Sequence, residues 1–292
     1  MKDIGTGKTV KTLLTNHNVR IKKHWGQNFL TDKNILAKIA MSGQIDKTTG
    51  VIEIGPGLGG LTEPLLELAG RVLAYEIDAE LIPILSANFA DRTNFTLIQA
   101  DILEVDIDEA IKTYLSEYKT IVVVANLPYY ITTPILMKFL ETTKTINRMI
   151  FMMQEEVARR VSGKPATKEY GALSVVIAYR AVTSYLFGVP RAVFIPEPNV
   201  DSAVVSVVFK PMSERLATDE PFFFRLVHQC FVQRRKTLAN NLLGADLGLN
   251  RERIEAVLDQ MELPRDVRAE RLNLAHFVRL AELVRPTKGD RT

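Results

Sequence analysis

The 292-residue sequence predicts an α/β fold in which a Rossmann-like sheet of parallel strands is followed by a smaller all-helical domain. Three observations support this prediction. Residues 51–54 form a short, mostly apolar run typical of a buried strand, and a glycine-rich turn and an apolar helical pattern follow it. Strand-like and helical segments then alternate as far as the strand expected at 148–153 and the helix after it. After Pro211 only helical periodicity remains, so we expect a domain boundary there.

The N-terminal residues are basic, and the sheet region is acidic. Residues 1–41 contain eight Lys and Arg against two Asp and Glu, whereas residues 42–211 carry a net charge of −5. We expect a flexible leader over 1–20, a sheet-containing domain over 21–211 and a helical domain over 212–292. Within the basic and aromatic run 22–30, Lys22 and Lys23 are candidates for contact with phosphate. The basic N-terminal arm suggests a polyanionic partner, whereas for residues 1–20 alone a solvated tail is the favoured alternative.

The composition excludes several classes of protein. A single cysteine, Cys230, leaves no internal disulfide framework and indicates a reducing compartment. The four histidines are scattered without the spacing of a metal site, so no metal is expected. No apolar run has the length that a membrane-spanning helix needs, and the N-terminus lacks a signal-peptide core. We therefore expect a cytoplasmic protein, with a monomer as the default.

The glycine turn is the first candidate ligand site. Gly55, Gly57 and Gly60 match the pattern G-x-G-x-x-G, which is weak on its own and is shared with dinucleotide-binding enzymes. Two features argue against a dinucleotide. Pro56 lies inside the turn, and Glu53 precedes it on the strand, where a carboxylate would repel a pyrophosphate. An acid at Glu53 suits a cationic ligand group such as an amine.

Acidic residues also follow the next two expected strands, 71–76 and 95–99. Glu76 lies 21 positions after Gly55, the spacing at which a carboxylate meets the ribose hydroxyls of a bound nucleotide. Asp101 follows the next strand and can accept a hydrogen bond from an adenine amino group, or it can cap a turn. Asp78 is expected to cap a helix, so the ribose role is assigned to Glu76.

The fourth expected strand, 120–125, is followed by Asn126, Leu127, Pro128 and Tyr129. This sequence resembles the catalytic signature of methyltransferases that act on amines of adenine, cytosine or glutamine. The Asn126 oxygen and a backbone carbonyl near Leu127 or Pro128 can accept the two N–H bonds of the target amine. Tyr129 offers a ring for stacking on a base. In the alternative interpretation Pro128 and Tyr129 are ordinary turn and core residues.

Further candidates lie in the second half of the chain. Two prolines make a stiff loop of the segment 193–205, which can hold Phe194 against the other face of a base, although Phe194 can equally be a core residue. Arg159 and Arg160 lie on the helix expected from Gln154. Residues Arg234, Arg235 and Lys236 lie in a segment expected to be helical, and all five cations are candidates for the RNA backbone. A solvated helix end is the alternative for Arg159 and Arg160.

Together, these segments resemble the rRNA adenine dimethyltransferase family from about residue 20 onward. The resemblance implies a class I S-adenosylmethionine-dependent methyltransferase sheet and dimethylation of two adjacent adenosines near the 3′ end of small-subunit (16S) rRNA. The implied partner is that RNA or the assembling small subunit. The resemblance implies that the cofactor is held by residues Asn28, Leu30, Gly55, Glu76, Asp101 and Asn126, with Gln27 beside them. Gly57 and Glu53 of the glycine turn and its strand are also expected to bind the cofactor. The resemblance further implies that residues 21–211 form the catalytic domain and that the helical domain 212–292 binds RNA.

Three other functions fit parts of the pattern. A large-subunit rRNA adenine methyltransferase of the antibiotic-resistance type shares the sheet motifs. A non-catalytic ribosome-assembly factor would keep the fold for RNA binding alone, but the complete Asn126–Tyr129 motif argues against it. A small-molecule methyltransferase would show little salt dependence of substrate affinity, whereas an RNA enzyme would show a steep one.

Overall fold

The computed structural model describes residues 4–22, 26–128, 131–161, 166–167, 170–244 and 247–285. The chain divides into two compact units. The first contains residues 1–158 and 183–209, and the second contains residues 159–182 and 210–292. The predicted boundary near Pro211 therefore lies close to one junction, but residues 159–182, expected in the catalytic domain, group with the C-terminal helices.

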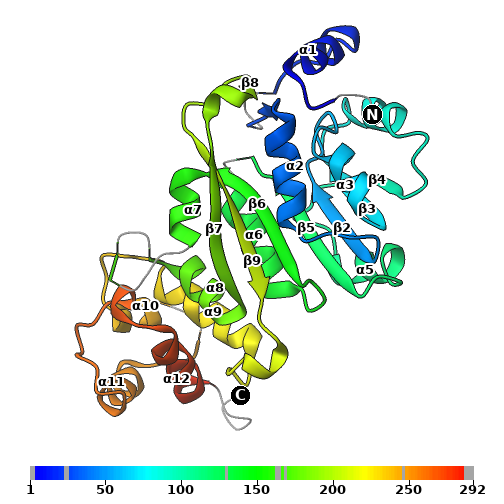
Figure 1. Ribbon diagram of the computed structural model, residues 1–292. Coiled ribbons are helices and arrows are strands. Elements are labelled where there is room, and N and C mark those ends of the chain that lie inside the picture. Colours follow the sequence, from blue (N-terminus) through cyan, green and yellow to red (C-terminus); the bar gives the residue numbers. More distant parts are fainter. Residues whose placement is uncertain are drawn as a thin grey trace. The chain divides into compact units, whose positions relative to one another are not determined.

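The first unit is built on a seven-stranded sheet with strand order β4-β3-β2-β5-β6-β9-β7 (Figure 1). Strands β2 to β6 pair in parallel, and β9 is antiparallel to β6. The order reverses between β2 and β5, where an open α/β sheet forms its ligand crevice. The strands are β2 (Thr49–Ile54), β3 (Arg71–Glu76), β4 (Phe95–Gln99), β5 (Thr120–Asn126), β6 (Arg148–Gln154), β7 (Ala181–Val189) and β9 (Ser202–Phe209).

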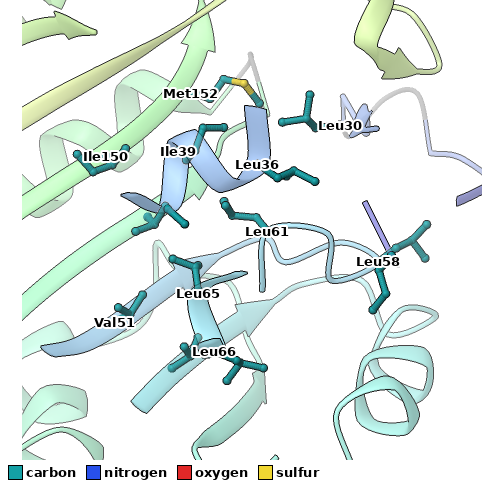
Figure 2. Close-up of a cluster of buried hydrophobic side chains, with 14 of the residues drawn as sticks. Leu30, Leu36, Ile39, Val51, Leu58, Leu61, Leu65, Leu66, Ile150 and Met152 are labelled. Atoms are coloured by element: carbon teal, nitrogen blue, oxygen red, sulfur yellow. The ribbon is translucent and has the colours of Figure 1, made fainter. Parts of the chain in front are cut away.

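Helices cover both faces of this sheet. Apolar side chains of α2 (Lys33–Ser42) and α3 (Thr62–Leu68) share one buried cluster with Val51 of β2 and Ile150 of β6, as Figure 2 shows. Phe151 points to the opposite face because neighbouring strand residues alternate. There its ring meets Phe139 of α6 (Thr132–Thr142), with the centroids 6.4 Å apart. Helices α4 (Ile82–Asn88) and α5 (Ile107–Tyr114) also belong to this unit.

The N-terminal residues differ from the expected flexible leader. Residues Gly7–Asn16 form helix α1, which Thr6 caps by accepting a hydrogen bond from the Thr9 amide. Val10 of this helix and Ile4 before it are buried in the core cluster of the first unit. A second, two-stranded sheet then pairs β1 (Phe29–Leu30) with β8 (Phe194–Ile195). The described residues of the expected leader, 4–20, therefore include a helix packed on the core of the first unit.

The second unit is helical and has its own aromatic core. Tyr179 of α8 packs on Phe223 of α9 with ring centroids 4.5 Å apart. The buried Arg180 guanidinium bonds the Glu220 carboxylate at 3.0 Å. Its described helices are α7 (Glu155–Val161), which crosses the boundary between the units, α8 (Ala172–Arg180), α9 (Glu220–Cys230), α10 (Leu238–Leu243), α11 (Arg251–Gln260) and α12 (Leu274–Val284), with short 3₁₀ turns at Met212–Glu214 and Ala269–Arg271. A further 3₁₀ turn, Arg191–Val193, belongs to the first unit. The predicted sheet and C-terminal helices are confirmed.

Candidate active site

One cavity lies at the carboxyl ends of four parallel strands of the first unit. The pairing of Ile54 with Ala125 brings Gly55 beside Asn126. The Ala100 amide donates to the Glu76 carbonyl at 3.1 Å, which brings Asp101 beside β3. Of the predicted site residues, those in the cavity wall are Gln27, Asn28, Leu30, Gly55, Gly57, Glu76, Asp101, Asn126, Leu127 and Pro128. Sequence segments far apart in the chain thus meet at the predicted place.

The glycine turn has the backbone geometry that the sequence predicts. Gly55 and Gly57 have φ values of +64° and +63°, in the region that favours glycine. A Cβ atom on Gly55 would meet no protein atom within 4 Å, so the space beside this residue is open. A Cβ on Gly59, with φ +93°, would instead lie 2.5 Å from the Phe89 ring. Gly55 thus gives a ligand access to the backbone, and Gly59 allows the turn to pack.

Glu76 is held from both sides by backbone amides. Its two carboxylate oxygens accept hydrogen bonds from the Gly57 amide at 3.1 Å and the Asp78 amide at 2.9 Å. Burial raises the pKa of Glu76 above its ordinary value, while these amides act in the opposite direction and the Asp78 charge adds to the rise. Each carboxylate oxygen retains a lone pair, which can accept a hydroxyl hydrogen bond from a ligand.

Asp78 links Glu76 to the segment that enters the site from the N-terminus. Its oxygens accept hydrogen bonds from Lys22 Nζ at 2.6 Å and from Gln27 Nε2 at 2.7 Å. The Lys22 amide in turn donates to Gln27 Oε1 at 2.8 Å. Burial raises the pKa of Asp78, but the bonds from Lys22 and Gln27 outweigh this and hold the pKa below its usual range. Lys22 and Gln27 are thus engaged with a buried carboxylate.

Asn126 is oriented by the segment that carries Asn28. The Asn126 side-chain nitrogen donates to the Asn28 carbonyl at 3.2 Å, and the Asn28 side chain donates to the Gly26 carbonyl at 2.9 Å. The bond to Asn28 fixes the orientation of the Asn126 amide, and its side-chain oxygen can accept a hydrogen bond from a ligand. The Pro128 carbonyl already accepts from Thr132 Oγ1 at 3.0 Å and from the Ile131 amide at 3.2 Å.

Asp101 and Glu53 differ in their access to the cavity. Asp101 is part of the wall, and one of its oxygens accepts from the Leu103 amide at 2.9 Å, so it also performs the turn-capping role. Glu53 is 1% exposed and lies outside the cavity wall, on the face of β2 that α3 covers. No ordinary hydrogen bond from the described residues reaches either Glu53 oxygen. Burial raises its pKa to about 8, the nearby Thr62 hydroxyl opposes the rise, and Glu76 adds to it.

The remaining predicted residues lie away from the cavity wall or outside the described residues. Phe194 is 3% exposed in β8, opposite Leu30. Arg159 and Arg160 are exposed at the end of α7. Residues 234–236 were expected on a helix, but they are exposed in the turn between α9 and α10, because α9 ends at Cys230. The predicted residues Lys23 and Tyr129 lie outside the described residues.

Three residues near the cavity were missed or given another role from sequence. Ile4 and Val10 form part of its wall, and Asp78, expected only as a helix cap, organises Lys22 and Gln27. A signal for α1 was present, because Thr6 precedes apolar residues at positions 10, 13 and 14.

Within the described part of the chain, no group of three metal-ligating side chains occurs. Nor does any described helix combine the length and apolar character needed to cross a bilayer.

The chain is similar in sequence to a known enzyme family over most of its length. A family model described as "Ribosomal RNA adenine dimethylase" matches residues 18–284. The ribosomal RNA small subunit methyltransferase A of Lactococcus lactis is 47% identical over 276 residues, covering 94% of this chain and 94% of that protein. The protein of the same name from Streptococcus pneumoniae is 46% identical over 278 residues, covering 94% and 96%.

Two solved structures resemble the fold. A dimethyladenosine transferase from Plasmodium falciparum aligns with a TM-score of 0.71 at 25% identity, covering 86% of this chain and 95% of that chain. The 23S rRNA methyltransferase ErmE aligns with a TM-score of 0.61 at 27% identity, covering 87% and 98%. The similarity therefore includes the C-terminal helices as well as the sheet.

Proposed function

The chain belongs to the ribosomal RNA adenine dimethylase family, and we propose that it dimethylates two adjacent adenosines near the 3′ end of small-subunit (16S) rRNA. The methyl donor is S-adenosylmethionine, and the reaction serves small-subunit biogenesis. The single observation that carries this proposal is that one cavity joins Gly55, Glu76 and Asp101 to Asn126. A nucleoside site and an amine-binding motif therefore share one wall. We further propose that the enzyme acts as a monomer in the cytoplasm.

The residues of the wall suit the parts of S-adenosylmethionine. Glu76 can accept from the ribose hydroxyls, and Asp101 can accept from the adenine amine. The open space at Gly55 lets the ligand approach the backbone without a side chain in the way. When bound, the sulfonium group supplies an electrophilic methyl group. Glu53 is buried beneath this turn, so we assign it support of the turn rather than direct contact.

The Asn126 motif can bind the target amine of the adenine. The Asn126 oxygen accepts one N–H bond, and the Leu127 carbonyl is the better candidate for the second, because two bonds already reach the Pro128 carbonyl. Two acceptors draw the amine away from planarity, so its lone pair becomes available to attack. No side chain acts as a dedicated base in this proposal, and the released proton goes to water.

The alternative substrate is large-subunit rRNA. The solved 23S rRNA methyltransferase shares 27% of its residues with this chain. The two bacterial small-subunit methyltransferases share 46–47%, and this difference favours the small-subunit substrate. An assembly factor without catalysis is less well supported, since the amide of Asn126 is held in the cavity wall by Asn28.

The direct test is to incubate the protein with isotope-labelled S-adenosylmethionine and undermethylated ribosomal subunits, followed by nucleoside analysis of each RNA. We expect labelled dimethyladenosine at two adjacent positions near the 3′ end of the small-subunit RNA. Label found only in large-subunit RNA would contradict the substrate. No label in either RNA, with intact RNA binding, would favour the assembly factor.

A further inference from the structure

The N-terminal segment, residues 4–22, contributes to the cavity wall at its start and, at its end, bonds Asp78, which in turn bonds the wall residue Glu76. At its start, Ile4 and Val10 belong to the cavity wall and are 1% and 2% exposed. At its end, Lys22 bonds the Asp78 carboxylate. All of these residues belong to the first unit, as does the cavity itself. The segment therefore borders the same cavity as the glycine turn and Asn126.

Close packing fixes the start of this segment. The Ile4 amide donates to Glu63 Oε2 of α3 at 3.3 Å. A Cβ atom on Gly5 would lie 2.6 Å from Leu36 Cδ1 of α2, so a larger residue here would require the Leu36 side chain to shift. A Cβ on Gly7 would lie 3.4 Å from Ile195 Cδ1 of β8. These contacts hold Ile4 beside α2, α3 and β8, which leaves its side chain on the wall of the cavity.

A continuous set of hydrogen bonds fixes the other end. Lys22 Nζ bonds Asp78 Oδ1 at 2.6 Å, and the Asp78 amide bonds Glu76 Oε1 at 2.9 Å. The second Glu76 oxygen is bound by the Gly57 amide of the glycine turn at 3.1 Å. A displacement of Asp78 would therefore move the amide that orients Glu76. Lys22 Nζ also lies 3.3 Å from Glu80 Oε1.

Resting on the proposed function, we propose that residues 4–22 are an integral part of the S-adenosylmethionine site. Ile4 and Val10 form an apolar wall that keeps water from the bound cofactor. Lys22 is a positioning residue that fixes Glu76 through Asp78, in place of the RNA contact expected from its charge. Because the cofactor and the docked segment share contacts, each stabilises the bound state of the other.

The wall is tested by titrating S-adenosylhomocysteine, the demethylated form of the cofactor, into full-length Val10→Ala protein by calorimetry. We expect a Kd about three- to tenfold higher than for the unchanged protein, since two buried methyl groups leave the wall. Leu13→Ala is the matched control, because Leu13 lies on the same helix and packs on the core without entering the wall. Equal Kd values for these two variants would overturn the wall assignment.

The positioning role is tested with Lys22→Met, Lys22→Arg and Glu80→Gln. We expect Lys22→Met to raise the KM for S-adenosylmethionine about three- to tenfold, with kcat and the salt dependence of RNA binding little changed. Lys22→Arg restores most of the affinity because the charge and donors remain. Glu80→Gln, which alters only the exposed partner of Lys22, leaves the KM unchanged. A normal KM with a shallower salt slope in Lys22→Met would assign Lys22 to RNA and overturn this role.

Hydrogen exchange reports whether the cofactor stabilises α1 more than amides far from the cavity. Saturating S-adenosylhomocysteine is expected to slow exchange of the α1 amides in the unchanged protein, and to slow it less in Val10→Ala. No ligand-dependent change in α1 would overturn the proposal. If the unchanged protein fails to bind S-adenosylhomocysteine at all, the proposed function fails instead, and calorimetry on that protein alone separates the two cases.

Discussion

At the residue scale, the orientation of the Asn126 amide depends on a backbone carbonyl nearly a hundred residues earlier in the chain. The bond to the Asn28 carbonyl at 3.2 Å commits the nitrogen and directs the oxygen to serve as acceptor. The motif alone could suggest Asn126 as an amine-binding residue. Which carbonyl accepts from Asn126 depends on the fold, because Asn28 directly precedes β1 and no local sequence pattern links it to β5.

Asn126→Ala is expected to slow methyl transfer about 10²–10³-fold while leaving RNA binding intact, because one acceptor for the developing charge on the amine is lost. The measurement is single-turnover methylation of undermethylated subunits, together with RNA binding of the same protein. Asn147→Ala is the control, since Asn147 accepts from the Ile121 amide at the opposite end of the same strands. Unchanged transfer in Asn126→Ala would remove this residue from the mechanism.

Burial also determines the protonation of Glu53. Its pKa is raised to about 8 from 4.5, so the folded protein holds a proton that the unfolded chain has already released at intermediate pH. Unfolding then releases that proton, and the folded state loses stability as the pH rises from 4.5 toward 8. Above pH 8 the folded protein ionises as well, and the loss levels off.

Glu53→Gln cannot ionise, so we expect its stability relative to the unchanged protein to improve across that pH window. The gain is about 1 kcal/mol per pH unit between pH 5 and 8, read as a slope of the difference in unfolding free energy. Urea unfolding at several pH values measures it. Glu104→Gln, which removes an exposed carboxylate from the same unit, controls for net charge. A difference that does not vary with pH would show that Glu53 is already ionised in the folded protein.

At the element scale, different glycines of the turn serve ligand access and packing. Gly55→Ala places a methyl group into open space of the cavity, whereas Gly59→Ala places one against the Phe89 ring. Both substitutions carry the cost of a positive φ, about 1–2 kcal/mol. We therefore expect Gly55→Ala to fold with a weakened affinity for S-adenosylhomocysteine, and Gly59→Ala to lose a further ~1–3 kcal/mol of stability from overpacking. Thermal unfolding and calorimetric titration of both variants distinguish the two effects. Weaker ligand binding in Gly59→Ala together with the larger loss of stability in Gly55→Ala would contradict these two roles.

Elements of this protein differ in how far sequence could predict them. Strands β2 to β6 were predicted closely, because an apolar run between turn residues is specific for a strand covered on both faces. Strand β7 lies at a sheet edge with mixed exposure, so its apolar pattern was too weak to define it. Residues 159–182 were assigned to the catalytic domain because they lie between strands in the sequence. Their partners, such as Glu220 for Arg180, come later in the chain.

At the scale of the whole molecule, the candidate cofactor site and the candidate RNA contacts lie in different units. The described cavity lies wholly in the first unit, and exposed cations in the turn between α9 and α10 belong to the second. Arg234 donates to the Tyr170 carbonyl at 3.1 Å and so also holds the second unit together. Arg235 and Lys236 are therefore the better residues with which to test contact between this turn and RNA.

The double variant Arg235→Gln/Lys236→Gln is expected to weaken RNA binding across sequences and to reduce the salt slope of log Kd by about 1–2, because each phosphate contact releases about one counterion. Its affinity for S-adenosylhomocysteine remains unchanged, since the cavity lies in the first unit. The control is Arg251→Gln/Arg265→Gln, which removes the same charge from positions bonded to Glu255. Filter binding of a small-subunit rRNA fragment at several salt concentrations measures the slopes. Equal slopes for both double variants would show that net charge alone, and not this turn, sets the affinity for RNA.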